Sequence, residues 1–256
     1  MAQSKIIDCF MFFNEVELLD LRLRTLKDHV DYFVLAEINI THSGKPKPYY
    51  FDEFKFLFKE YNIIHLKDVM PPDPNPWVVE NAHRNMLQKG YDSAFPDDYI
   101  IISDLDEIPN PVRIHEGINM GLNSFGLHQD LYCYYTNCKS AQIWAGSVVI
   151  KKKYIKTPQH VRNNRFNQPI NFPDGGWHYT SMGGKERIRL KFDSFAETDF
   201  NIYQYMNDSN LDECLETGKD LTGRTESYAQ KRFIDDSEVT HKEVLSWRNE
   251  YPNFWK

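Results

Sequence analysis

The segment from Asp98 to Pro109 constrains this chain more than any other part of it. A run of β-branched residues predicts a buried strand, and three acidic residues follow it before a proline ends the run. Side chains two apart on an extended backbone point the same way, with about 7 Å between their Cα atoms. Asp104 and Asp106 can therefore share one hard cation, since Mg²⁺ and Mn²⁺ prefer carboxylate and phosphate oxygens. Such a cation would hold the diphosphate of a sugar nucleotide; the alternative interpretation is an inert acidic turn.

Composition excludes several classes of partner. The 256 residues suffice for one large domain with a real core, and 41% of them are hydrophobic. The chain has 30 basic and 37 acidic residues, a net charge of −7, without a long basic run. Nucleic acid and anionic membranes are therefore not expected as main partners. An anionic substrate needs a local cation, supplied by a metal ion or an arginine.

The cysteines and the apolar stretches set the expected compartment. Four cysteines lack the spacing of a zinc site; Cys133 and Cys138 could pair, but nothing requires it. No secretory signal or transmembrane segment is evident, because the first residues are polar and the apolar run of residues 6–13 contains Asp8. We expect a cytoplasmic, reduced protein.

The first half of the chain alternates strand-like and helix-like segments, which predicts a mostly parallel central sheet flanked by helices, an α/β fold. The expected strands are residues 6–12, 32–36, 63–66 and 99–103, and the expected helices are residues 15–28, 51–61 and 77–90. The second half is less regular. It carries strand-like segments at residues 125–135, 147–150 and 177–180, and a mainly helical C-terminal part from about residue 185.

Three polar residues lie where predicted strands end. In open α/β sheets, ligands bind beyond the carboxyl ends of the strands, so Asn14, Glu37 and Asp104 can meet in one cleft. Each has a simpler interpretation as well. Asn14 is expected to cap the following helix, with Glu17 in the capping-box position, and Glu37 can be an ordinary loop carboxylate.

Residues spread over most of the chain resemble those of glycosyltransferase family 17, whose known type is the β-1,4-mannosyl-glycoprotein N-acetylglucosaminyltransferase. The resemblance covers roughly residues 5 to 225, and its motifs are specific as a set although each is weak alone. The matching residues are Phe13, Asn14, Glu15, Glu17, Leu18, Leu19, Asp20, Arg22, Val30, Asp31, Phe33, Val34, Glu37, Asn39, Thr41, Gly44, Pro46, Pro48, Arg84, Asp104, Asp106, Glu107, Ile108, Pro109, Gly176, Trp177 and His178.

The resemblance implies a GT-A-like fold, a UDP-sugar donor (UDP-GlcNAc in the known activity), a Mn²⁺ or Mg²⁺ ion, and transfer with inversion to a glycan acceptor. It implies a single glycosyltransferase domain over residues 1–256. Residues 1–123 would bind the nucleotide sugar, and residues 124–256 would form the acceptor-binding and helical part. Residues 179–181 and the loops of residues 137–175 differ from the family pattern. Because acceptor choice usually resides in such loops, the acceptor need not carry over.

The resemblance also suggests roles for the metal and donor sites. Asp106 is the first choice as metal ligand, and Asp104 is a second ligand or a ribose contact. His178 is a third ligand, since neutral imidazole binds Mn²⁺, or a structural histidine. Arg84 can clamp the diphosphate or brace Asp104. The remaining expected nucleotide contacts are Phe13, Asn14 and Glu37.

Inverting transfer requires a general base that deprotonates the acceptor hydroxyl. The candidates are Glu107, Asp174 and Glu186, and Glu107 can instead orient the metal ligands. Trp144 and Trp177 can stack on a sugar ring, although most aromatic residues of this chain are expected in the core.

Two alternatives to a transferase remain open from the sequence. One is a non-catalytic carbohydrate-binding protein that has kept the fold. The other is a nucleotidyltransferase acting on sugar phosphates, which should carry a Gly-, Arg- or Lys-rich phosphate loop near the first strand. The residues after the first predicted strand, Phe12 to Glu15, do not resemble such a loop.

Overall fold

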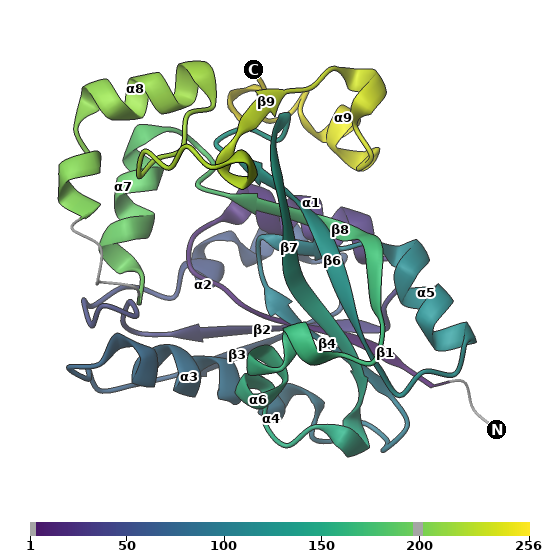
Figure 1. Ribbon diagram of the computed structural model, residues 1–256. Helices are drawn as coiled ribbons and strands as arrows, with labels where there is room; N and C mark the ends of the chain where they lie inside the picture. The colour runs from purple at the N-terminus through teal and green to yellow at the C-terminus, as the bar shows by residue number, and fades with distance from the viewer. Residues whose placement is uncertain (1–3, 197–201) are drawn as a thin grey trace.

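The computed structural model describes residues 4–196 and 202–256, and a mixed β-sheet runs through its centre (Figure 1). The strands are β1 (Ile6–Met11), β2 (Tyr32–Ile38), β3 (Ile63–Asp68), β4 (Tyr99–Asp104), β5 (Glu107–Pro109), β6 (Ser124–Cys133), β7 (Cys138–Lys151), β8 (Asn171–Thr180) and β9 (Lys231–Phe233). The α-helices are α1 (Val16–Leu26), α2 (Tyr50–Phe54), α3 (Pro76–Met86), α4 (Gln88–Tyr91), α5 (Pro111–Asn119), α6 (Pro158–Asn163), α7 (Lys185–Ser194), α8 (Asp208–Thr217) and α9 (Glu243–Trp247). Short 3-10 helices are η1 (Lys55–Phe58), η2 (Lys152–Tyr154), η3 (Arg165–Asn167), η4 (Ile202–Tyr205), η5 (Ser227–Ala229), η6 (Asp236–Glu238) and η7 (Pro252–Phe254).

The strand order is β3-β2-β1-β4-β7-β6-β8-β5, with β9 paired to β7. Strands β1 to β4 pair with one another in parallel, as the alternating pattern of the first half predicted. Beyond β4 the sheet is mixed: β7 is antiparallel to β4 and β6, whereas β6 and β8 are parallel. The predicted α/β class, with a central sheet flanked by helices, is confirmed, and the parallel arrangement is confined mainly to the first half.

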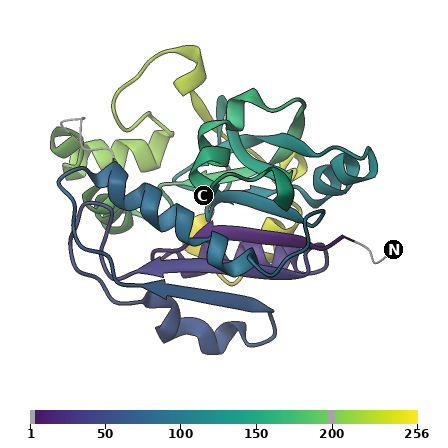
Figure 2. The ribbon, with the colours of Figure 1, turned by 90° about the horizontal axis from the view of Figure 1, so that it is seen from below.

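Helices cover both faces of the parallel strands (Figure 2). Leu19 and Leu23 of α1, Phe51 of α2 and Ile114 of α5 pack on one face. The other face is covered by apolar side chains of α3, α4 and α6, namely Val79, Met86, Leu87, Tyr91 and Val161. Because side chains alternate along each strand, the apolar run of β4 supplies both cores at once.

The first two helices differ in detail from their predicted bounds. Helix α1 begins after Glu15, which is its N-cap, so the expected capping role of Asn14 is wrong. The backbone carbonyl of Asn14 instead accepts a hydrogen bond from the amide of Val16. The helix begins at Val16, one residue later than predicted. The expected helix of residues 51–61 is split into α2 and η1.

The predicted helix of residues 77–90 is divided into α3 and α4, and Gly90 lies inside α4 rather than at a helix end. A Cβ atom at Gly90 would lie 2.2 Å from Cγ1 of Val34 on β2. The missing side chain thus permits close packing of α4 on the sheet, so this glycine serves packing rather than chain termination.

In its described residues, the C-terminal part carries α7, α8 and α9 and the short strand β9, and is mainly helical as expected. In Figure 1, α7 and α8 lie beside the upper ends of β6, β7 and β8. All four cysteines are buried and free. Among the described residues, every helix is too short or too polar to cross a bilayer.

Candidate active site

The sheet brings Asp104, Asp106 and His178 together. Asp104 ends β4, and Asp106 lies in the turn between β4 and β5. Strand β5 pairs with β8 so that Glu107 lies opposite His178, and the Nε2 atom of His178 is 3.5 Å from Oδ2 of Asp106. Strand β5, which follows the turn with Asp106, and strand β8, which carries His178, are therefore adjacent, although 72 residues separate Asp106 from His178 in the sequence.

A glycine makes this pairing of β5 and β8 possible. Gly176 has a φ of +148°, and a Cβ atom there would lie 2.2 Å from the carbonyl oxygen of Ile108 on β5. Any side chain at this position would push β5 away from β8. The glycine before Trp177 thus has a structural role in setting the spacing between Asp106 and His178.

The turn that carries Asp106 is held from behind by Arg22 of α1. This guanidinium is fully buried, forms an ion pair with Asp8 at 2.6 Å and donates to the hydroxyl of Ser103. It also donates to the backbone carbonyls of Asp104, Leu105 and Glu107 at 2.9, 3.1 and 3.0 Å. One arginine therefore fixes the backbone on both sides of Asp106.

Asp104 is paired with two arginines. Arg84 of α3 donates to one carboxylate oxygen at 2.9 Å, and Arg162 of α6 donates to the other at 2.7 Å. Burial raises the pKa of Asp104, but Arg162 and Arg84 outweigh this effect and hold the pKa below its usual range. Its side chain is still 29% exposed, so the carboxylate faces solvent at one side, whereas the side chains of Arg84 and Arg162 are buried.

Asp106 has a different partner, the ammonium group of Lys191 on α7. The Nζ atom lies 2.9 Å from Oδ2 of Asp106 and 3.0 Å from the hydroxyl of Thr180. Burial raises the pKa of Asp106, and Lys191 followed by His178 lowers it further than burial raises it. The carboxylate is therefore ionised and neutralised by a protein cation.

Glu107 is saturated with hydrogen bonds. Its carboxylate accepts two from Arg162, one from the indole Nε1 of Trp144 at 2.6 Å and one from the backbone amide of Asp104 at 2.9 Å. The residue is fully buried. This placement leaves no lone pair for a substrate and gives Glu107 the orienting position rather than that of a base.

The other predicted bases lie apart from this cluster. Tyr179 donates its amide to the carbonyl of Asp106, and Asp174 lies five residues earlier in β8, roughly 16 Å along an extended strand. Its side chain is 75% exposed and lies 3.6 Å from Arg113. Glu186 is exposed on the first turn of α7, where it accepts a hydrogen bond from Arg189.

The predicted nucleotide contacts divide into two groups. Asn14 lines a cavity of about 30 Å³ together with Glu15, Asp106 and Lys191, which is room for about one water molecule. Burial raises the pKa of Glu15, and Lys191 offsets part of that increase. Phe13 lies beside the cavity residues in sequence and packs edge-on against Tyr50, with 5.6 Å between ring centroids.

Glu37 is enclosed instead. Its carboxylate accepts hydrogen bonds from the backbone amides of Tyr50 and Phe51, which are the first residues of α2, and from Lys47 and His65. None of its surface is exposed. In this structure Glu37 anchors a loop and a helix N-terminus.

A divalent cation fits part of this arrangement. Within residues 4–196 and 202–256, no three His, Cys, Asp or Glu side chains form a ready-made metal cage. Asp106 and His178 offer one oxygen and one nitrogen within reach of a single ion, and Nδ1 of His178 is buried without a hydrogen-bond partner among the described residues. Both oxygens of Asp104 are bound to arginines, so its direct ligation would require release of one of them.

Two cations of the site were not identified from the sequence. Arg162 lies in a segment given no secondary structure there, although Thr157 before Pro158 is a helix-start signal that would have located α6. Lys191 is one of several charged residues in α7, and nothing in its neighbourhood marks it. The contacts of Arg162 and Lys191 with the acidic residues are seen only in the folded structure.

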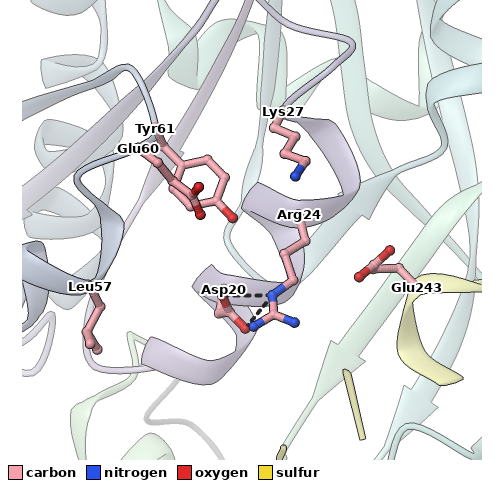
Figure 3. Close-up of a pocket in the computed structure, with 7 residues that line it drawn as sticks. All are labelled: Asp20, Arg24, Lys27, Leu57, Glu60, Tyr61 and Glu243. Carbon is pink, nitrogen blue, oxygen red and sulfur yellow. Dashed lines mark hydrogen bonds and ion pairs between the residues drawn. The ribbon is translucent and has the colours of Figure 1, made fainter. Parts of the chain in front are cut away.

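A separate surface hollow of about 360 Å³ lies between α1, the segment after η1, and α9 (Figure 3). Its charged groups include Arg24, which pairs with Asp20 and with Glu250. None of the residues lining it belongs to the predicted site.

Sequence comparison places the chain in a family. The sequence model of glycosyltransferase family 17 matches residues 1–244. The rat protein named beta-1,4-mannosyl-glycoprotein 4-beta-N-acetylglucosaminyltransferase is 33% identical over 269 residues, which cover 88% of this chain and 49% of that protein. The mouse protein of the same name is 24% identical over the same shares of the two chains. The chain thus spans about half the length of these curated relatives.

Among solved structures, residues 1–349 of S. aureus TarS match 98% of this chain and 80% of that one, at 11% identity and a TM-score of 0.42. The same protein in complex with UDP gives 10% identity and a TM-score of 0.41 over the same shares. No functional argument follows from similarity at this level. The family match, which extends over nearly the whole chain, is sufficient: this protein belongs to glycosyltransferase family 17.

Proposed function

We propose that this protein is a metal-dependent, inverting glycosyltransferase that transfers GlcNAc from UDP-GlcNAc to a hydroxyl of a mannose-containing glycan. The observation that carries the proposal is the proximity of His178 to Asp106, which lies on a turn fixed by Arg22. Family membership supports the reaction class. The printed name of the rat and mouse relatives supports GlcNAc as the sugar and a mannosyl glycan as the acceptor.

We assign the donor to the half of the chain formed by residues 1–123. Asn14 and Glu15 follow β1, and Arg84 and Asp104 flank the same edge of the sheet. Arginine binds phosphate through two parallel hydrogen bonds, so Arg84 and Arg162 can turn from Asp104 to the diphosphate. Residues 124–256, which include His178 and Lys191, then supply the acceptor side.

Asp106 and His178 would hold Mn²⁺ or Mg²⁺, with phosphate oxygens and water completing the coordination shell. When bound, the ion stabilises the negative charge that develops on the departing diphosphate. Glu107 supports this arrangement by fixing Arg162 and Trp144 around the site. Lys191 contacts one of the two carboxylate oxygens of Asp106, so an ion bound there would compete with its ammonium group for Oδ2.

We propose Glu15 as the general base. It lines the same cavity as Asp106, and burial raises its pKa toward the range in which a carboxylate accepts a proton effectively. Glu15→Gln should lower kcat by about 10²- to 10⁴-fold while UDP binding persists. Glu186→Gln is the matched control on the exposed turn of α7 and should have little effect. A larger loss of kcat in Glu186→Gln than in Glu15→Gln would identify Glu186 as the general base instead.

The proposed function is tested by sugar transfer and nucleotide binding in parallel. Thermal shifts with UDP, GDP, CDP, ADP and dTDP, each with Mn²⁺ or EDTA, should show stabilisation by UDP with Mn²⁺, because a ligand that binds only the folded state raises its midpoint. Transfer of radiolabelled GlcNAc to a mannosyl glycan should occur under the same conditions. Stabilisation by another nucleotide, or glycan binding without transfer, would contradict the proposal.

A further inference from the structure

Four planar side chains form a row that leads from the protein surface to Asp106. Phe166 of η3 lies under the guanidinium of Arg165, with 4.3 Å from the ring centroid to Cζ. The same guanidinium lies 5.9 Å from the ring of Trp144, and Trp144 lies 4.8 Å from the ring of His178. The row ends at Asp106, because Nε2 of His178 lies 3.5 Å from its carboxylate.

The outer end of this row is open. Phe166 is 61% exposed, so its ring is accessible to a ligand. Arg165 and Trp144 are partly buried beside it. Burial, followed by repulsion from Arg162, lowers the pKa of Arg165, and its Nε atom has no hydrogen-bond partner among the described residues. The row thus presents an aromatic face and an incompletely bonded guanidinium together.

The second tryptophan named from the sequence does not extend the row. Trp177 is buried and stacks on His241, with 3.9 Å between ring centroids and an interplanar angle of 8°. Its indole nitrogen donates to the hydroxyl of Thr240. Trp177 is therefore a core residue, and Trp144 and Phe166 supply the aromatic faces of the row.

This combination suits a carbohydrate. The C–H groups on one face of a pyranose ring are apolar and pack on an aromatic face, while its hydroxyl groups accept hydrogen bonds from an arginine. A phosphate group would use the guanidinium but not the aromatic faces beside it. We infer that Phe166, Arg165 and Trp144 bind the acceptor glycan and orient its reactive hydroxyl toward the site at Asp106. This inference rests on the proposed transferase function, and it specifies where the second substrate lies.

Phe166 allows a clean test because no described hydrogen bond or ion pair depends on its side chain, whereas Trp144 holds Glu107. Saturation-transfer NMR with mannose- and GlcNAc-terminated oligosaccharides would measure glycan binding, and the thermal shift with UDP and Mn²⁺ would measure donor binding. Phe166→Ala should weaken glycan binding and raise the acceptor KM by about tenfold, with the UDP shift unchanged. Phe166→Tyr should restore binding.

The matched control is Phe56→Ala. Phe56 of η1 is similarly exposed, at 59%, but lies among the first-half elements rather than on the row. Equal effects of Phe56→Ala and Phe166→Ala, or no glycan signal in a wild-type protein that binds UDP, would overturn the inference and leave the donor assignment standing. Glycan binding that is lost in Phe166→Ala by a protein that binds no nucleotide would support the row and refute the transferase.

Discussion

Glu37 and Asp104 carry the same sequence signal and have different surroundings. Each is an acidic residue at or near the carboxyl end of a parallel strand, on β2 and β4 respectively. Glu37 is enclosed by Lys47, His65 and the first amides of α2. Asp104 remains partly exposed between two arginines, two residues before Asp106.

The difference teaches that position at a strand end is necessary for a site of this kind but not sufficient. A carboxylate satisfied by its own loop has no capacity left for a ligand, and its function is to hold the chain. A carboxylate paired with long, flexible cations can exchange those partners for a ligand. The following predictions test this contrast, from the largest expected effect to the smallest.

Glu37→Gln should lower the free energy of unfolding by about 3 kcal/mol, because it leaves the buried ammonium of Lys47 without its counter-ion. Urea denaturation followed by fluorescence would measure the loss. Asp68→Asn is the matched control at the end of β3, where the carboxylate forms an exposed pair with Lys89 and should contribute less than about 1 kcal/mol. If Glu37→Gln abolished UDP binding in a stable protein, the contrast between the two carboxylates would fail.

Asp106→Asn should leave the fold intact and lower kcat by about 10²- to 10³-fold, the loss expected on removing one preorganised electrostatic partner of the transition state. Initial rates of GlcNAc transfer at saturating donor and acceptor would measure it. Circular dichroism would verify the fold. A variant that retained wild-type turnover would show that Asp106 is as purely structural as Glu37.

Lys191→Met should affect two ligands in opposite directions. Without the competing ammonium, Asp106 should bind Mn²⁺ about tenfold more tightly in the absence of nucleotide, whereas UDP should bind less tightly because a nearby cation is lost. Titration calorimetry would measure both affinities. Lys185→Met is the control on the same helix, because Lys185 pairs with Asp212 away from the site. Changes of the same sign for both ligands would argue against an exchangeable lysine.

The loss of folding stability at low pH should depend on Asp106 and the cations that neutralise it. The folded pKa of Asp106 is lowered, so its ionisation contributes stability above the unfolded pKa of about 3.9 and loses that contribution as the pH falls below it. Asp106→Asn should therefore flatten the acid limb of the stability profile by roughly 1 kcal/mol or more. Thermal melts between about pH 5 and pH 2 would show this. An acid limb as steep as that of the wild type would mean that Asp106 is not a major contributor to acid unfolding.

The sequence was sufficient for the features that depend on local pattern. The apolar run before Asp104 predicted β4, and the spacing of leucines predicted α1 to within a few residues. The alternation of strands and helices predicted the parallel arrangement of β1 to β4. These features follow from burial and backbone geometry over short stretches, which a single sequence displays.

The partners of the site residues could not be predicted in the same way. Arg162 and Lys191 are 58 and 85 residues from the carboxylates they neutralise. The enclosure of Glu37 depends on side chains from a loop and another strand. The exposed position of Asp174 follows from the pairing of β5 with β8, which periodicity does not specify. Long-range pairings of single side chains leave no periodic trace in a sequence.

The contacts of Arg22 also affect which parts of this protein can unfold locally. Its five hydrogen-bond donors connect α1 to β1, β4 and the turn after β4, so that turn cannot loosen while α1 remains packed. The amide protons of the turn after β4 should therefore exchange with deuterium only in the global unfolding reaction, at rates like those of the central strands. Lys191 approaches Asp106 from α7, on the other side of the turn, and the amides of α7 should exchange sooner. The carboxylate of Asp106 would then be held as firmly as the core, while Lys191 and α7 remain free to rearrange.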